Sequence, residues 1–297
     1  MKRLFVTALL LGGLLCSASA ATTINPVNKF SYGANIGWMD WRGDTNNGAV
    51  IGEFVCSGFI YAANVGWISL GSGAPANGIR YQNNSAADFG VNHEGGGNLI
   101  GFAYGANIGW INFTNRDAGG GFFDGPKVDL LTGRLSGFVW SANCGWISLS
   151  NAQAFVQTDT IPMGIDTDGD GIPDAWELQF AGNLATMSAV TDTDHDGFSD
   201  LQEYLADTDP LDPSSQLRIT LYSASAGGSP ANITWTSRPT RLYHIQKRTQ
   251  LEPGFPWSDI GLGLISPDAG STTSRAFTDS PSPQRFFSIQ AVKPLSP

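Results

Sequence analysis

Phe102-Ala-Tyr-Gly-Ala-Asn-Ile-Gly-Trp110 is one of four copies of a nine-residue motif in the first half of the chain. The other copies occupy residues 30–38, 59–67 and 138–146, so successive motif tryptophans are 29, 43 and 36 residues apart. Repetition on this scale is typical of a repeat architecture, in which each unit buries an apolar face against its neighbours. The motif therefore predicts a four-unit repeat domain over residues 21–150.

Each copy of the motif predicts a β-hairpin. Its first and third residues are aromatic, so both rings leave the same face of a strand. The Asn-x-Gly that follows is a turn signal, because Asn tolerates left-handed backbone and Gly adopts positive φ. A second alternating strand begins at Trp-Ile, and a further strand precedes the motif at 99–102 and 135–138. Each unit is therefore expected to be a small β-meander.

The repeated tryptophans and asparagines allow two interpretations. A residue that recurs at one place in every unit is most simply a packing residue, which favours a core position for the tryptophans. Alternatively, the indole rings are sugar-binding shelves and the amides reach sugar hydroxyls. By the first interpretation the asparagines form turns and contact no ligand. The residues concerned are Trp38, Trp67, Trp110 and Trp146, with Asn35, Asn64, Asn107 and Asn143.

Residues 1–20 have the features of a secretory signal peptide. Lys2 and Arg3 precede an apolar run that ends at Leu15, and small residues at 18–20 supply a cleavage site. The run is too short to span a bilayer, and no other apolar stretch of membrane length follows it. Over about residues 27–150 the repeats resemble a tryptophan-rich Ser-x-Asn-x-Gly-Trp-Ile motif of exported bacterial proteins. We therefore expect a bacterial protein that is secreted, extracellular or periplasmic, with no transmembrane span after cleavage.

Two cysteines, Cys56 and Cys144, remain after the predicted cleavage. The exported location permits a disulfide between them. Each cysteine also stands where other copies of the repeat carry an apolar residue, so two small buried thiols fit the sequence equally well. Sequence does not determine the Cα separation that a disulfide needs, and both alternatives stay open.

Composition and charge narrow the class of protein. Of 297 residues 41% are hydrophobic and 14% charged, and 37 are glycine, which is typical of turn-rich β structure. A net charge of −10 provides no basic surface for nucleic acid or for an anionic membrane. Half of the 26 acidic residues fall between residues 166 and 212. There they alternate with glycine and apolar residues, a pattern that indicates cation ligands.

Two segments of this acidic block fit the twelve-residue calcium loop. Both have Asp at positions 1, 3, 5 and 9, Gly at position 6 for the sharp turn, and Glu at position 12 to supply two oxygens. The backbone carbonyl at position 7 adds a ligand. The sequence therefore predicts two Ca²⁺ ions. Their expected ligands are Asp166, Asp168, Asp170, Ile172, Asp174 and Glu177 in the first loop, and Asp192, Asp194, Asp196, Phe198, Asp200 and Glu203 in the second.

Residues 151–215 are expected to form a linker around these loops. Short helices are predicted over 174–180, 181–190 and 201–206, and no helix enters the first loop. From about residue 165 the segment resembles the bacterial thrombospondin type 3 repeat, including its trailing Asp207-Thr-Asp-Pro-Leu-Asp-Pro213. The resemblance implies EF-hand-like loops whose ions act structurally. A dockerin is the alternative. Dockerin loops differ from these at position 12, and the recognition residues of dockerins are not found in this chain.

Residues 216–297 predict a β-sandwich. Alternating β-branched runs at 217–222, 232–236, 241–246, 272–277 and 285–290 are separated by Pro and Gly clusters. The segment resembles the fibronectin-like modules that follow calcium repeats in exported bacterial proteins, with Trp235, Tyr243, Trp257 and Phe286 as expected core residues. The whole chain is thus predicted to be mainly β, with an N-terminal β-repeat domain, a short helical calcium-loop linker and a C-terminal β-sandwich.

The sequence carries no catalytic signature. There is no His-Glu-x-x-His zinc site, no Gly-x-Ser-x-Gly elbow and no phosphate loop. We therefore expect a secreted, non-enzymatic calcium-binding protein with a structural or adhesive role at the cell surface, and with surface glycans or other surface proteins as partners. The alternative is a lectin-like carbohydrate-binding protein that uses the tryptophan-rich repeats. A polysaccharide-active enzyme is a third hypothesis, because two carboxylates suffice for glycoside hydrolysis. The acids available outside the calcium loops are Asp40, Glu53, Asp88, Glu94, Asp124 and Asp129.

Overall fold

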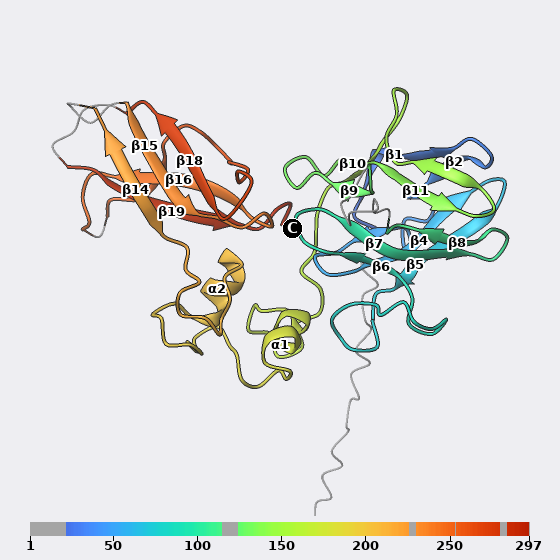
Figure 1. Cartoon of the computed structure of the whole chain (residues 1–297), viewed down its shortest axis with the longest axis horizontal. Coiled ribbons are helices and arrows are strands. Elements are labelled where there is room, and N and C mark those ends of the chain that lie inside the picture. Colours follow the sequence, from blue (N-terminus) through green and yellow to red (C-terminus); the bar gives the residue numbers. More distant parts are fainter. Residues whose placement is uncertain (1–21, 115–123, 226–229, 253, 280–283, 297) are drawn as a thin grey trace, which may run out of the picture.

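The computed structural model describes residues 22–114, 124–225, 230–252, 254–279 and 284–296. The predicted signal peptide lies outside the described residues. The described part is mainly β, as predicted: a strand-rich N-terminal part, an acidic segment with two short helices, and two C-terminal sheets (Figure 1). In the described ranges, no helix is long and apolar enough to cross a membrane.

The four motif copies form four antiparallel hairpins that together make one closed sheet. Its strand order is β12-β11-β8-β7-β5-β4-β2-β1, and β12 pairs in turn with β1. The same register recurs at each junction between hairpins, so that Ile68 faces Gly105 and Ile147 faces Gly33. The hairpins are β1 (Ile24–Gly33) with β2 (Gly37–Asp40), β4 (Cys56–Ala62) with β5 (Gly66–Ser72), β7 (Leu99–Gly105) with β8 (Gly109–Asn112), and β11 (Phe138–Ser141) with β12 (Gly145–Ser148).

The hairpin turns are the predicted Asn-x-Gly segments. In the third copy the Ile108 N–H donates to the Gly105 carbonyl at 3.1 Å, and Gly109 follows with φ of +71°. A tight turn followed by one left-handed residue is a favoured short hairpin connection, and glycine accepts that φ without a Cβ clash. The turn prediction is therefore confirmed.

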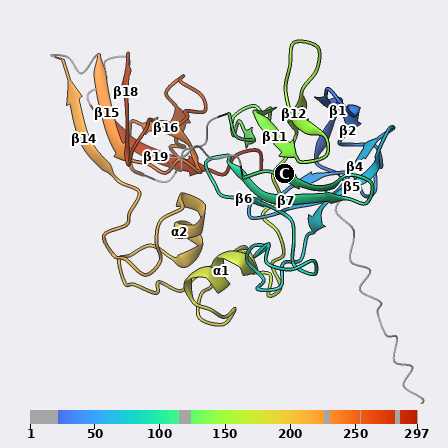
Figure 2. The ribbon, with the colours of Figure 1, turned by 45° about the vertical axis from the view of Figure 1, so that its right-hand side comes forward.

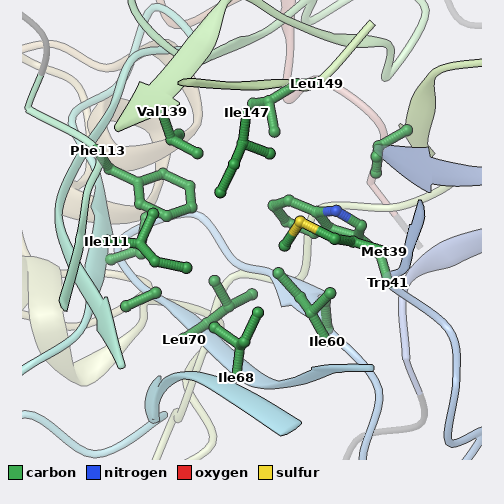
Figure 3. Packing of buried hydrophobic residues seen from close by; sticks show 14 of the residues in the cluster. Met39, Trp41, Ile60, Ile68, Leu70, Ile111, Phe113, Val139, Ile147 and Leu149 are labelled. Atoms are coloured by element: carbon green, nitrogen blue, oxygen red, sulfur yellow. The ribbon is translucent and has the colours of Figure 1, made fainter. Parts of the chain in front are cut away.

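The interior of the closed sheet is the main hydrophobic core (Figure 3). On the hairpin strands, the core residues occupy the positions that alternate with the motif aromatic residues. Ile60 and Ile68, which face each other across the second hairpin, are at most 1% exposed, and Val139 and Ile147 are equally enclosed in the fourth at no more than 2%. Figure 3 shows these aliphatic side chains converging with Trp41 and Phe113. Trp41 is a non-motif tryptophan whose Nε1 donates to Ser31 Oγ at 2.8 Å.

The motif tryptophans lie on the outer face, so the prediction that they are core residues is wrong. Trp38, Trp67, Trp110 and Trp146 are 47%, 46%, 44% and 53% exposed. Side chains alternate across a strand, so burial of Ile68 necessarily turns its neighbour Trp67 outward. The prediction failed because both alternating sets of residues are apolar, and the repetition alone does not say which set faces the interior.

Short strands flank the hairpins, and the two cysteines are buried within the hairpins themselves, Cys56 in β4 and Cys144 in the turn between β11 and β12. The short strands are β3 (Val50–Ile51) on β4, β6 (Val91–His93) on β7, β13 (Val156–Thr158) on β1, and β9 (Lys127–Val128) with β10 (Leu135–Ser136). Cys56 and Cys144 are free thiols, so the disulfide alternative is wrong. Burial raises the pKa of the Cys56 thiol to about 12, and the thiol is neutral at physiological pH.

The C-terminal part consists of two three-stranded sheets that share one core. Trp235 and Tyr243 are fully buried in it with ring centroids 5.8 Å apart, whereas Trp257 and Phe286 are only partly buried. The strands lie close to the predicted runs. One sheet has β14 (Ile219–Ala224), β15 (Ala231–Thr236) and β18 (Thr272–Phe277), and the other has β17 (Ser258–Asp259), β16 (Leu242–Arg248) and β19 (Phe286–Val292).

Two of the three predicted helices form in the acidic segment. These are α1 (Asp174–Phe180) and α2 (Asp200–Ala206), the second with a capping box between Ser199 and Gln202. The predicted helix over 181–190 is absent, and that part of the prediction is wrong. Gly182 adopts φ of +71°, and Asn183 bonds the backbone of Ala181 and Ala185, so local hydrogen bonds replace helical ones.

Candidate metal centre in the acidic segment

Each predicted calcium loop brings three aspartates together. Asp166, Asp168 and Asp170 each offer a carboxylate oxygen within 4.8 Å of the other two. In the second loop the same arrangement is formed by the aspartates at its positions 1, 3 and 5, namely Asp192, Asp194 and Asp196. Within the described ranges these are the two clusters of this kind.

The loop backbone holds the first aspartate of each cluster. Asp166 accepts hydrogen bonds from the backbone N–H groups of Gly169 and Gly171 at 2.8 and 3.0 Å. Asp192 accepts hydrogen bonds from the N–H groups of Asp196 and Gly197 at 3.2 and 3.0 Å, and the bond from the position-6 glycine is common to both loops. The glycines at position 6 have φ of +93° and +97°, a conformation that explains the Gly required there.

The glutamates at position 12 lie in the first turn of the two helices and are buried. Glu177 is 0% exposed and Glu203 is 1% exposed. Neither carboxylate oxygen of Glu177 has a hydrogen-bond partner in the described structure, and Glu203 has one unpartnered oxygen, its other oxygen accepting from Thr208. Burial, together with repulsion from the nearby aspartates of its own loop, raises the pKa of each glutamate to about 7. An ionised carboxylate buried in this way requires a compensating cation.

The unpartnered oxygens fit calcium. Asp170, Asp194 and Asp196 each add one buried oxygen without a partner in the described structure. Every donor is a hard oxygen, as Ca²⁺ and Mg²⁺ prefer, and the number of oxygens in each loop suits calcium's larger coordination sphere. Bound calcium would supply the positive charge that these carboxylates lack.

The aspartates at position 9 are placed differently from the other predicted ligands. Asp174 accepts hydrogen bonds from the backbone N–H and the hydroxyl of Thr167 at 2.7 and 2.6 Å. Asp200, which is fully buried, binds Thr193 in the same way at 3.1 and 3.0 Å. Both aspartates lie outside the two clusters and brace the loop against the start of its helix. A Thr-x₆-Asp spacing, present in both loops, is the sequence signal for this brace.

The two loops differ in burial at position 7. Ile172 is fully buried and Phe198 is 40% exposed, so the two predicted carbonyl donors share no side-chain environment. His195 is exposed and has a left-handed backbone with φ of +65°, at the position that Gly169 occupies in the first loop. His195 is therefore a turn residue, and it is not a member of the aspartate cluster of its loop.

The acidic segment contacts the closed sheet through Tyr204, the residue after Glu203. Its hydroxyl donates to Glu53 Oε2 at 2.7 Å, and the ammonium of Lys293 lies 2.9 Å from the same oxygen. Its ring packs in a small core with Trp176 of α1 and Phe54 of the closed sheet. The second predicted calcium loop, which ends at Glu203, is thus followed directly by the residue that contacts the N-terminal part.

Arg241 joins the C-terminal sheets to α2. Its guanidinium donates to the carbonyls of Tyr204 and Leu205 at 2.6 and 2.9 Å and lies 3.5 Å from Glu53. A cation at a helix C-terminus satisfies carbonyls that have no partner in the helix and interacts favourably with the helix dipole. Figures 1 and 2 both place α2 below the C-terminal sheets, with α1 beside it on the side of the closed sheet. Sequence analysis missed this contact, since Arg241 follows α2 by more than thirty residues and no motif links them.

The four motif tryptophans form separate aromatic faces around the closed sheet. Each stands opposite the third motif residue of its own hairpin, and in the first three hairpins the Tyr and Trp ring centroids are 4.9 Å apart. The candidate sugar-binding rings are thus accessible, one face to each hairpin. They do not share a single groove.

The motif asparagines form turns, as predicted, and also join neighbouring hairpins. Each side-chain amide donates to a turn carbonyl of the adjacent hairpin at 3.0 Å, and the four bonds close a ring. They run from Asn64 to Ile36, from Asn107 to Val65, from Asn143 to Ile108, and from Asn35 to Cys144. The sequence signal for this ring is the invariance of Asn among the four copies, which a turn alone does not require.

Three of the acids outside the loops, Asp40, Glu53 and Asp88, each have separate partners. Asp40 pairs with Lys29 at 2.7 Å, and Glu53 with Lys293 as described above. Asp88 accepts from the backbone N–H groups of Ala76 and Gln82 at 3.1 Å.

Comparison with known proteins identifies the acidic segment. Residues 166–179 and 192–213 match the family model of the bacterial TSP3 repeat, so the resemblance to thrombospondin type 3 repeats is confirmed for this part of the chain. A search of curated proteins and a search of solved structures find no similar protein. The repeat type and the two aspartate clusters together identify a calcium-binding modular protein.

Proposed function

We propose that this chain is a secreted, non-enzymatic bacterial protein with a structural or adhesive role at the cell surface. The observation that carries the proposal is the pair of equivalent aspartate clusters, each beside a buried glutamate with unpartnered oxygens. Two calcium ions would complete these loops. Because α2 contacts both Glu53 and Arg241, the ions would also fix the closed sheet against the C-terminal sheets.

The calcium part of the proposal is tested by calorimetry on the chain lacking residues 1–20. We expect two ions per chain, and a melting temperature that rises with calcium. If free calcium exceeds Kd a hundredfold, each site contributes about 2.7 kcal/mol of stabilisation. An alanine variant of Asp168 and Asp194 should bind neither ion. Wild-type protein whose melting temperature is unchanged by chelation would refute the proposal.

A second candidate function, carbohydrate binding, is favoured by the exposure of the motif tryptophans. Exposed aromatic faces that recur around a surface are more than a soluble protein needs, and large exposed apolar areas mark binding surfaces. Rings of Tyr and Trp offer flat apolar faces, with a polar atom at the edge that reaches water. Sugars combine apolar ring faces with hydroxyl groups, so they match this surface.

A glycan array probed with the full mature chain separates the two candidates. A carbohydrate-binding protein should retain glycans on the array, and retention should fall when several motif tryptophans are replaced by alanine. A purely structural protein should retain none. Attachment of the wild-type chain to envelope preparations that lack glycans would favour the adhesive role through protein partners.

A further inference from the structure

We propose that a neutral oligosaccharide binds in two adjoining hollows on the outer face of the closed sheet, on either side of Phe89. The inference rests on the second proposed function, and it names the hairpins and the class of sugar. The first hollow lies on the third hairpin and is lined by Asn83, Asn84, Ser85, Ala86, Phe89, Phe102 and Trp110. The second lies toward the second hairpin, where Phe89 is joined by Phe59, Asn47 and the serines Ser57, Ser69 and Ser72.

The third hairpin differs from the others because Phe89 adds a wall to its aromatic face. The Phe89 ring meets Trp110 edge-on, with centroids 5.1 Å apart and an interplanar angle of 82°. Phe102 meets Trp110 from its own strand at 6.1 Å. Within the described residues, the tryptophans of the other three hairpins have the equivalent of Phe102 without an added ring. The rings of Phe89, Phe102 and Trp110 thus surround a site on the third hairpin, whereas in the described part of the chain the aromatic faces of the other hairpins lack the added ring.

Polar groups beside these rings are available for a ligand. The side chains of Asn84 and Ser85 are exposed and make no hydrogen bond to the described part of the chain. The same is true of Ser57, a half-buried residue at the second hollow. An amide and two hydroxyls supply both donors and acceptors, which is what a sugar hydroxyl requires. Aromatic walls with a few placed polar groups are the usual composition of a small-ligand site.

The absence of charge selects a neutral ligand. None of the residues lining the two hollows is Asp, Glu, Lys or Arg, in a chain whose net charge is −10. A phosphate or carboxylate ligand would find no cation here, and nucleic acid requires several. A neutral polyhydroxylated chain satisfies the exposed amide and hydroxyls and leaves no charge unpaired.

The loop that carries Phe89 is held in place before any ligand arrives. The insertion that lengthens the spacing between Trp67 and Trp110 to 43 residues contains this loop. Tyr81, only 3% exposed, exchanges two backbone hydrogen bonds of 2.9 Å with the side chain of Asn92. Asp88, also buried, receives N–H groups from two segments of the same loop. A preformed site loses less conformational entropy on binding than a mobile one.

Calorimetric titration of the full mature chain with cellohexaose, and separately with chitohexaose, tests this site. We expect at least one of these neutral hexasaccharides to bind with a stoichiometry of one and to change tryptophan fluorescence. Trp110→Ala and Asn84→Ala should each weaken binding at least tenfold. Trp38→Ala, the matched tryptophan of the first hairpin, should change the affinity less than twofold. Asn84 is exposed, so its variant should keep the circular dichroism spectrum of the wild type.

Three results would overturn the inference. Binding of neither hexasaccharide would do so, as would tighter binding of hexagalacturonate, an anionic hexasaccharide. Equal losses from Trp38→Ala and Trp110→Ala would also reject it, but would leave carbohydrate binding by the repeats intact. A silent glycan array, in contrast, would reject the carbohydrate-binding function itself.

Discussion

The closed sheet and the acidic segment satisfy the hydrogen-bonding groups of their polar side chains in opposite ways. In the closed sheet the motif asparagine amides donate hydrogen bonds to turn carbonyls of the adjacent hairpin, and aliphatic side chains fill the interior. In the acidic segment the buried carboxylates of Glu177 and Glu203 have unpartnered oxygens, and the core is a small cluster around Trp176. The polar groups of the closed sheet find their partners within the protein, whereas the buried carboxylates of the acidic segment need a cation as partner.

This difference shows how repetition and metal binding substitute for one another. Four copies of one hairpin can close a ring, so that every copy supplies the partner its neighbour needs. A short acidic segment with two seven-residue helices buries little apolar surface, so we expect ligand binding to contribute to its stability. The predictions below separate the two regions, beginning with the largest expected effect.

Calcium removal should affect the acidic segment and spare the closed sheet. With EGTA, we expect amide hydrogen exchange over residues 166–212 to rise towards that of an unfolded chain, because about 2.7 kcal/mol per site is lost at a hundredfold excess over Kd. Exchange in β4, β5, β7 and β8 should stay slow. Mass spectrometry of peptic fragments measures both regions at once. Equal loss of protection in the closed sheet would contradict the comparison.

Replacement of Ile68 by alanine should destabilise the closed sheet alone. Its side chain is fully buried, and a large-to-small change of this kind costs about 2–5 kcal/mol. Trp67→Ala, one residue away on the exposed face, is the matched control and should cost about 0.5–1.5 kcal/mol, the value of its ring pair with Tyr61. Urea unfolding measures both variants, and calcium stoichiometry should stay at the wild-type value. A larger loss of unfolding free energy for Trp67→Ala than for Ile68→Ala would contradict the outward position of the tryptophan.

Arg241→Met should weaken the contact between the acidic segment and the C-terminal sheets. The change removes charged hydrogen bonds to two carbonyls at the end of α2, for which we expect a loss of about 1–3 kcal/mol. The readouts are amide exchange of α2 and the radius of gyration from small-angle X-ray scattering, which should increase. Arg248→Met is the control, since Arg248 lies at the other end of β16 from Arg241 and stacks on Trp257.

Calcium affinity should fall when the pH is lowered through 7. In the calcium-free fold the pKa of each glutamate is about 7, above the ordinary 4.5. Protonation of these glutamates therefore stabilises the calcium-free fold. Their ionisation lowers the stability of that fold as the pH rises from about 4.5 to 7. Calcium binds the ionised form, which is about one tenth of the population at pH 6. Titrations should therefore show a roughly tenfold weaker Kd per site at pH 6 than at pH 8. An affinity that is constant over this range would contradict the burial of these glutamates.

Asn64→Ala should produce the smallest effect, a loss of about 1 kcal/mol for one hydrogen bond. Its amide joins the second hairpin to the Ile36 carbonyl of the first. The same replacement at Asn35, Asn107 or Asn143 should cost the same within error, because the ring is equivalent at each junction. Thermal unfolding measures the four variants. A cost confined to one of them would show that the ring does not act as four equal links.

The alternation of residues in the repeats predicted hairpins and turns correctly, but it did not assign the faces. Ile68 and Trp67 are both apolar, and a strand pattern distinguishes two faces only when one is polar. The calcium loops were more fully specified, because ligand spacing within twelve residues is a local property. The hydrogen bonds between Asp174 and Thr167 were not predicted, because a ligand and a brace both require an oxygen at position 9.

The sequence by itself determined the repeat, its turns, the two metal-ligating loops and the strands of the C-terminal part, because each depends on residues close together in the chain. The tertiary structure alone decided which face of the hairpins is buried, that Cys56 and Cys144 stay apart as free thiols, and that Arg241 reaches the end of α2. These depend on closure of the sheet and on contacts between residues far apart in the chain. Such contacts are selected by how the whole surface packs, and no local pattern encodes them.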